Sequence, residues 1–91
     1  MLEVVLSNRF RRDLKRAVRR GCDPALLESV VNLLAARRPL PDANRDHALT
    51  GNWIGYRECH IQPDWLLIYK VSDNELVLLL MRTGTHSDLF L

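Results

Sequence analysis

The hydrophobic residues in the first half of the chain predict one strand followed by two amphipathic helices. Leu2–Leu6 is a short run of apolar and β-branched residues, which favours an opening strand. From Asn8 to Gly21 the apolar residues recur at helical spacing, with Ser7 suited to cap the start of the helix and the glycine suited to end it. A second helix is expected to begin at Asp23-Pro24 and to end near Arg37-Arg38. The two helices should form a hairpin.

The second half of the chain carries three further strand candidates. Trp53–His60 has bulky residues at alternate positions, whereas Asp64–Val71 and Glu75–Met81 are almost continuously apolar, as expected for central strands covered on one or both faces. Turns are predicted at Gln62-Pro63 and at Ser72–Asn74. The order β-α-α-β-β-β predicts an α+β fold, in which an antiparallel-rich sheet packs against an N-terminal helical hairpin.

Length and composition fit one small domain. The 91 residues are too few for a second independent core, so residues 1–91 are expected to form a single domain. No stretch approaches the roughly 18 apolar residues that span a membrane, and the N-terminal apolar run is too short for a signal peptide. We therefore expect a cytoplasmic protein with no membrane partner, in which Cys22 and Cys59 are reduced thiols.

Positive charge is concentrated in the first half of the chain. Residues 1–46 contain ten Lys/Arg and six Asp/Glu, whereas residues 47–91 contain three and five. Seven of the cations lie between Arg9 and Arg20 with only Asp13 among them, which favours an anionic partner over a merely solvated surface. Contacts of this kind to RNA would weaken steeply with salt. The residues expected to make them are Arg9, Arg12, Lys15, Arg16, Arg19 and Arg20.

Candidate reactive groups lie in the second half: the three histidines His47, His60 and His86, together with Asp64 and Arg82. Histidine can act as an acid or a base near neutral pH, and arginine offers a forked positive charge that matches phosphate. The set suits cleavage of a phosphodiester by proton transfer, without a metal or a cofactor. Taken singly, each group could be ordinary: a histidine at a strand end is often only a surface residue, and the arginine could pair with a surface carboxylate such as Asp88.

Other chemistries have less support. No histidine pair shows HxH or HExxH spacing and neither cysteine lies at a zinc-ligand interval, so no metal site is expected. A Cys59 nucleophile beside His60 is unconvincing, because adjacent residues on a strand point to opposite faces. Phe90, close to the end of the chain, is a candidate for stacking on a base, whereas Trp65 is by default a core residue.

Two ordered blocks of residues stand out in the second half. They are Pro63-Asp64-Trp65-x-Leu67-Ile68-Tyr69-Lys70 and Arg82-Thr83-Gly84-Thr85-His86-x-x-Leu89-Phe90. Together with Asp46-His47, Gly55-Tyr56-Arg57 and His60, they resemble the YafQ branch of the RelE/ParE toxin superfamily, whereas the first half matches only in its helical pattern. The resemblance implies a RelE-like fold and a ribosome-dependent mRNA endonuclease, the toxin of a type II toxin–antitoxin pair, which cuts codons in the ribosomal A site.

The resemblance also assigns roles to residues. Carried over by position, the active-site set of the family falls on His47, His60, Asp64, Arg82, His86 and Phe90. We expect His86 to be the general acid, Arg82 to hold the scissile phosphate and Phe90 to stack on a base, while the other three share the base and positioning roles in an order left open. Trp65 and Arg57 are further candidates for contact with the substrate.

The partners implied are a cognate antitoxin, the ribosome with its RNA, and mRNA, with operator DNA bound only through the antitoxin complex. The basic helix could face either ribosomal RNA or an acidic antitoxin. Two alternative functions remain. One is a ParE-like toxin that binds DNA gyrase without cutting RNA, which would not be expected to keep three histidines around an arginine. The other is an inactive module that only binds its antitoxin.

Overall fold

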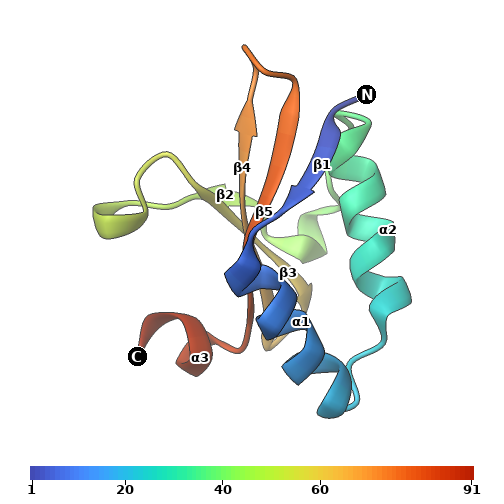
Figure 1. Cartoon of the computed structure of the whole chain (residues 1–91), viewed down its shortest axis with the longest axis vertical. Coiled ribbons are helices and arrows are strands. Elements are labelled where there is room, and N and C mark those ends of the chain that lie inside the picture. Colours follow the sequence, from blue (N-terminus) through green and yellow to red (C-terminus); the bar gives the residue numbers. More distant parts are fainter.

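Five strands form one sheet in the computed structural model, which describes residues 1–91 (Figure 1). They are β1 (Glu3–Leu6), β2 (His47–Ala48), β3 (Arg57–Gln62), β4 (Trp65–Ser72) and β5 (Val77–Gly84). Their order across the sheet is β1-β5-β4-β3-β2, with β1 parallel to β5 and every other neighbouring pair antiparallel. The α+β fold and the antiparallel-rich sheet predicted from the sequence are confirmed.

The helices are α1 (Asn8–Arg19), α2 (Pro24–Ala35) and the short α3 (His86–Phe90), with two 3-10 turns, η1 (Asp42–Asn44) and η2 (Gly51–Trp53). Ser7 caps α1 as predicted, because its Oγ accepts the Phe10 N–H at 2.9 Å. Asp23 likewise caps α2, with Pro24 at its first position. The longest helices have 12 residues, and none is long and apolar enough to cross a membrane.

The central strand β4 is buried on both of its faces, whereas its continuous apolar sequence predicted cover on one or both. Trp65, Leu67 and Tyr69 point into the larger core, where they meet the apolar faces of α1 and α2. Leu66 and Ile68 point the other way and pack against Leu89 of α3 in a smaller cluster. The sheet thus separates a helix-covered face from a second face, which we call the open face.

The register between β4 and β5 contains a bulge at Met81. Ile68 pairs with Arg82, but the next residue of β4, Tyr69, pairs with Leu80, so Met81 is an extra residue in β5. The bulge is held from outside the sheet, because the Ser7 hydroxyl donates to the Met81 carbonyl at 2.7 Å. On one side of the bulge Leu78 and Leu80 lie in the larger core, and on the other side Arg82 pairs with Ile68 of the open face.

Several predicted boundaries were wrong for local reasons. Helix α2 ends at Ala35 rather than near Arg37-Arg38, because Arg37 adopts a left-handed conformation (φ 58°) and the N–H groups of these two arginines close the helix on earlier carbonyls. Strand β3 begins at Arg57 rather than at Trp53, which lies in η2. Strand β5 continues through Arg82 to Gly84, and neither β2 nor α3 was predicted.

Candidate active site on the open face of the sheet

Strand pairing brings three of the predicted site residues to the open face. His47 of β2 pairs with Glu58 of β3, Glu58 with Ile68 of β4, and Ile68 with Arg82 of β5. Residues paired in this way share a face, so they form one row across four strands. At about 4.8 Å per strand, the row is roughly 15 Å long. His60 lies in the next row, paired with Leu66.

His47 and His60 flank the carboxylate of Glu58. The Nδ1 of His47 lies 2.7 Å from the Arg45 carbonyl, and that of His60 lies 3.2 Å from the Pro63 carbonyl. A carbonyl oxygen can only accept, so each Nδ1 carries a proton. The Nε2 atoms, which are free to take up a proton, lie 3.9 and 3.5 Å from Glu58 Oε1. The two imidazoles therefore share one acidic neighbour, which is itself buried.

Asp64 and His86 form a second group, at the end of the sheet where β3 turns into β4. Asp64 lies in that turn, and its Oδ1 accepts the backbone N–H of His86 at 3.3 Å, at the first position of α3. One turn later along α3, the ring centroid of Phe90 lies 4.9 Å from that of His86. The imidazole of His86 is exposed. This group thus presents a free histidine beside an aromatic ring.

Arg82 is held by Asp13 of α1 rather than by Asp88. Its Nε and Nη2 donate to the two carboxylate oxygens at 2.8 and 3.0 Å, which is a forked pair. Asp13 is only 6% exposed, and it also accepts the Thr83 N–H at 3.2 Å and lies 3.3 Å from Arg16 Nη2. The hydrogen bond to Asp13 raises the pKa of Arg82, so the guanidinium stays cationic.

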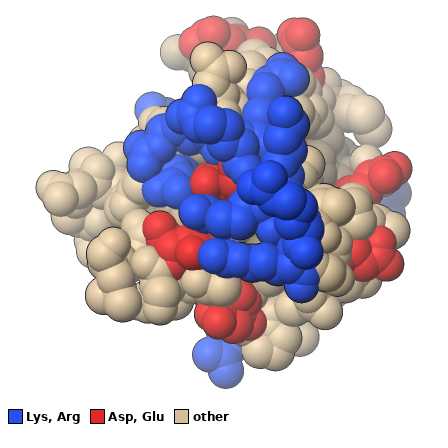
Figure 2. Space-filling view, turned by 60° about the horizontal axis from the view of Figure 1, so that its bottom comes forward, with Lys and Arg blue, Asp and Glu red and all other residues tan.

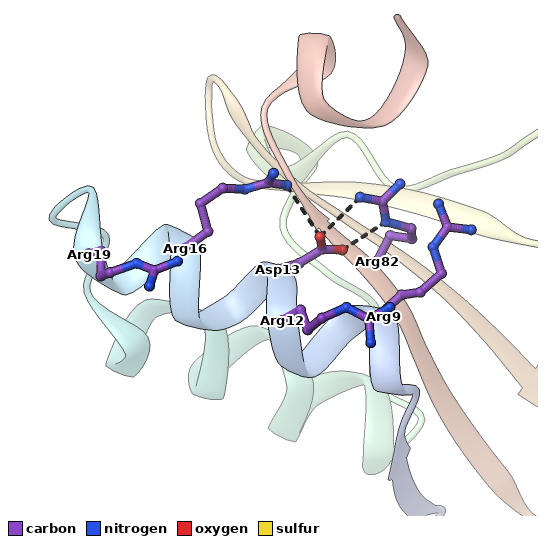
Figure 3. Close-up of a pocket in the computed structure, with 6 residues that line it drawn as sticks. All are labelled: Arg9, Arg12, Asp13, Arg16, Arg19 and Arg82. Carbon is purple, nitrogen blue, oxygen red and sulfur yellow. Dashed lines mark hydrogen bonds and ion pairs between the residues drawn. The ribbon is translucent and has the colours of Figure 1, made fainter.

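The basic residues of α1 gather on one side of the molecule, around a small acidic area (Figure 2). Close up, they line a hollow of about 360 Å³ between α1 and β5, with Asp13 at its floor (Figure 3). The hollow has no hydrophobic lining residue. Its six residues are Arg9, Arg12, Asp13, Arg16, Arg19 and Arg82. Of the six cations that the sequence assigned to this face, Lys15 lines a separate groove and Arg20 makes an ion pair.

That ion pair ties α1 to α3. Arg20 Nη1 donates to Asp88 Oδ2 at 2.7 Å, and Asp88 also accepts the Thr85 N–H, so it completes a capping box at the start of α3. Arg16 Nη2 lies 4.0 Å from the same carboxylate. Asp13, which is buried, therefore connects α1 to Arg82 of β5. Asp88, which is half-buried, connects α1 to α3.

The Asp88 ion pair predicts a pH dependence of folding. The hydrogen bond from Arg20, followed by that from Thr85, lowers the pKa of Asp88 to about 2. A carboxyl whose pKa is lower in the folded state stabilises the fold above its unfolded pKa of about 3.9 and loses this effect as the pH falls through about 2. We therefore expect Asp88→Asn to lower the free energy of unfolding at pH 7, and the deficit relative to wild type to shrink between about pH 4 and pH 2.

Urea unfolding at several pH values measures this deficit. Asp73→Asn is the matched control, because Asp73 pairs with Arg37 at an exposed site, where ion pairs contribute little at any pH. A deficit for Asp88→Asn that is equally large at pH 7 and at pH 2 would contradict the prediction.

Two residues expected to contact substrate lie elsewhere. Trp65 is 3% exposed, and its indole N–H donates to Thr83 Oγ1 at 2.9 Å within the larger core, so its ring is not available to a substrate. Arg57 pairs with Tyr69 across the sheet and bonds to Asp46 and to the Tyr69 hydroxyl, on the face opposite to Glu58. Both residues support the fold beneath or beside the site.

Three acidic residues of the site were not singled out from the sequence. Glu58 had a signal, because it lies two residues before His60 and so shares its face of the strand. Asp88 follows Thr85 at the capping-box interval. Asp13 had no such signal, since it and Arg82 are 69 positions apart.

The structure offers neither a reactive cysteine nor a cluster of metal-binding side chains. Burial raises the pKa of the Cys59 thiol to about 12, which leaves it protonated and unreactive at neutral pH. No group of three or more His, Cys, Asp and Glu side chains is arranged to hold a metal ion. The absence of a metal from the reaction stays a prediction.

A family model and a curated relative both match almost the whole chain. A family model described as "Bacterial toxin of type II toxin-antitoxin system, YafQ" matches residues 2–91. The mRNA interferase toxin YafQ of Escherichia coli K12 is 42% identical over 89 residues, which are 97% of this chain and 95% of the relative.

Solved structures are equally similar. A metal-bound toxin from Helicobacter pylori has a TM-score of 0.94 and 44% identity, with 99% of this chain and 100% of that one covered. YafQ in the E. coli DinJ-YafQ complex has a TM-score of 0.89 and 41% identity, with 99% of each chain covered. The chain therefore belongs to the YafQ family of bacterial toxins from type II toxin–antitoxin systems.

Proposed function

We propose that this chain is an mRNA interferase, a ribosome-dependent endoribonuclease that cuts mRNA in the ribosomal A site. Residues 1–91 act as a single toxin domain in the cytoplasm, where translating ribosomes are found. A cognate antitoxin holds the toxin in check, as the DinJ-YafQ complex suggests, and operator DNA is bound only through that complex. The single observation that carries the proposal is the placement of proton acceptors, a fixed arginine and an exposed histidine around one sheet face.

The reaction is attack of a ribose 2′-OH on the adjacent phosphorus. A base takes the 2′-OH proton, the 2′-oxygen bonds to phosphorus, and the bond to the 5′-oxygen of the next nucleotide breaks as an acid protonates that oxygen. The products are a 2′,3′-cyclic phosphate and a 5′-hydroxyl. Each well-placed proton transfer contributes about 10²- to 10⁴-fold. The chain's own acid and base carry these steps, without a metal.

His60 and His47 are the candidates for the base, because their protonated Nδ1 atoms leave Nε2 free to accept a proton. Glu58 lies beside both Nε2 atoms and would stabilise the positive charge that either ring gains. Asp64 binds the backbone of His86 instead, which favours a positioning role for this carboxylate. The sequence left these roles unranked.

His86 is the candidate for the acid, and Phe90 beside it would stack on a base of the substrate. Arg82 would stabilise the charge on the scissile phosphate, and Asp13 leaves its Nη1 edge free for this contact because it occupies Nε and Nη2. The alternatives of a gyrase poison and of an inactive module are not favoured, because the curated E. coli relative is named an mRNA interferase.

In vitro translation of a defined mRNA, with and without the protein, tests the function when followed by primer extension. We expect codon-phased cuts that require the ribosome. Equal cutting of the same mRNA without ribosomes, or no cutting on ribosomes, would overturn the proposal. DNA damage after expression in cells, without codon-phased mRNA ends, would instead indicate action on gyrase.

Removing the charge of Glu58 should slow cleavage. Glu58→Gln keeps the size of the side chain but no longer stabilises a protonated His47 or His60, and loss of one interaction with a charged group costs about 10- to 100-fold in rate. Single-turnover cleavage on ribosomes loaded with mRNA measures the rate at saturating toxin. Glu75→Gln, in the exposed loop before β5, is the matched control. A wild-type rate for Glu58→Gln across pH 6 to 9 would remove Glu58 from the site.

A further inference from the structure

The hollow between α1 and β5 is a charged site whose cations are only partly neutralised. It is lined by five arginines and one aspartate. Asp13 is committed to Arg82, to the Thr83 N–H and to Arg16. The remaining arginines, Arg9, Arg12 and Arg19, make no ion pair within the chain (Figure 3).

The spacing of these arginines on α1 is unfavourable for the helix alone. Arg9, Arg12, Arg16 and Arg19 follow one another at three- or four-residue intervals, so they form a single stripe. Like charges at these intervals destabilise a helix. The stripe costs stability, and its acidic neighbours Asp13 and Asp88 are already committed to Arg82, Arg16 and Arg20, so it is better explained by an anion that binds there.

The lining of the hollow points to phosphate rather than to an acidic peptide. It contains no hydrophobic side chain, whereas the neighbouring groove contains Leu6, Leu14 and Val18 beside Arg11 and Lys15, with Arg19 lining both. Guanidinium groups match phosphate oxygens in a forked geometry. A protein partner would be expected to bury apolar side chains as well, and only the groove offers them.

We propose that the hollow binds a backbone phosphate of the mRNA substrate, next to the linkage that is cut. The proposal rests on the mRNA interferase function above and goes beyond it. Arg82 connects the two sites, because its side chain lines the hollow while its backbone pairs with Ile68 of the open face. A phosphate in the hollow and the scissile phosphate at Arg82 are therefore neighbours along one strand of RNA.

The test combines a substitution of one arginine in the hollow with removal of the charge of one phosphate in the mRNA. Arg12→Gln removes a cation that lines the hollow, and Arg11→Gln removes its sequence neighbour, which lines the groove instead. The substrate is a short synthetic mRNA on the ribosome, in which one linkage near the cleavage site is a neutral methylphosphonate. The modified linkage is moved through the positions that flank the one that is cut.

At one flanking position, we expect the methylphosphonate to slow cleavage by wild type and by Arg11→Gln about 10-fold, as befits one lost charged hydrogen bond. Arg12→Gln should be about 10-fold slower than wild type on unmodified mRNA, and the methylphosphonate at that position should slow it little further. This non-additivity identifies the phosphate that the hollow holds.

Other outcomes separate the possible failures. If wild type does not cut unmodified mRNA on ribosomes, the proposed function fails. If wild type cuts but the two effects multiply at every position, or Arg12→Gln cuts as fast as wild type, the hollow does not hold a substrate phosphate. If Arg12→Gln weakens binding to ribosomes that carry no mRNA as much as to those that do, ribosomal RNA is the occupant and the proposal is overturned.

Discussion

Replacing His86 with glutamine should slow cleavage of ribosome-bound mRNA by about 10²- to 10⁴-fold, because it removes the proposed proton donor for the 5′-oxygen. The fold should be unaffected, since the contacts that place this residue do not involve its ring: Asp64 accepts its backbone N–H, and the Thr85–Asp88 capping box fixes the start of α3. Single-turnover rates on a defined mRNA measure the loss.

Ser87→Ala is the control for this variant, since residue 87 is the exposed neighbour of His86 on α3. Urea unfolding should give the same free energy for wild type and His86→Gln. A cleavage rate for His86→Gln within a few-fold of wild type would mean that another group, or water, protonates the leaving oxygen. A large loss of stability would mean that the ring supports the fold.

Replacing Asp13 with alanine should lower the free energy of unfolding by about 3 to 5 kcal/mol, because removal of one partner leaves the other charge buried and unpaired. The orphaned partner is Arg82, whose side chain is only 12% exposed, and the Thr83 N–H loses its acceptor as well. Since a domain of this kind is stable by about 5 to 15 kcal/mol, a large part of the total would be lost. Urea unfolding measures the change.

Asp42→Ala provides the comparison, because Asp42 is exposed in η1 and makes no ion pair. Its effect should stay within about 0.5 kcal/mol. Asp13→Asn keeps the volume of the side chain and one acceptor, so its loss should be intermediate. If Asp13→Ala costs less than about 1 kcal/mol, Arg82 has found solvent or another partner, and Asp13 does not hold it.

Local sequence patterns were enough to predict the framework of this fold. The spacing of Phe10, Leu14 and Ala17 identified the buried face of α1, and Ser7 and Asp23 marked the starts of two helices because capping depends on neighbours in the chain. The continuous apolar run of β4 indicated burial on one or both faces, and the two hydrophobic clusters show that both are covered.

Features that depend on distant contacts could not be predicted in the same way. β5 extends through polar Arg82 and Thr83 because β4 is there to pair with them. α3 is five residues long, too short to show a period, and is held by its capping box and by Arg20. The sequence suggested Asp88 as the partner of Arg82, and only the placement of α1 against β5 explains why Asp13 has that position instead.

Only some residues of the candidate site could be predicted from the sequence. Resemblance to a family gave a set of six residues, all of which lie on the open face or at its end: His47, His60, Asp64, Arg82, His86 and Phe90. Glu58 and Asp13 were missed, and Asp88 was named only as a possible partner of Arg82, because these acids act by holding other residues of the site. Acidic residues that position cationic or imidazole groups have no composition signal of their own.

The bulge at Met81 decides which side chains of β5 point to the open face of the sheet. Side chains alternate between faces, so if Met81 were paired in a regular ladder instead of bulging out of it, Arg82 would follow Leu78 and Leu80 into the larger core, and Thr83 would turn toward the open face. A chain that kept Met81 in a regular ladder would still carry every candidate acid, base and cation. It would nevertheless direct the Arg82 side chain into hydrocarbon, so the irregularity of β5 decides which face of the sheet receives this arginine.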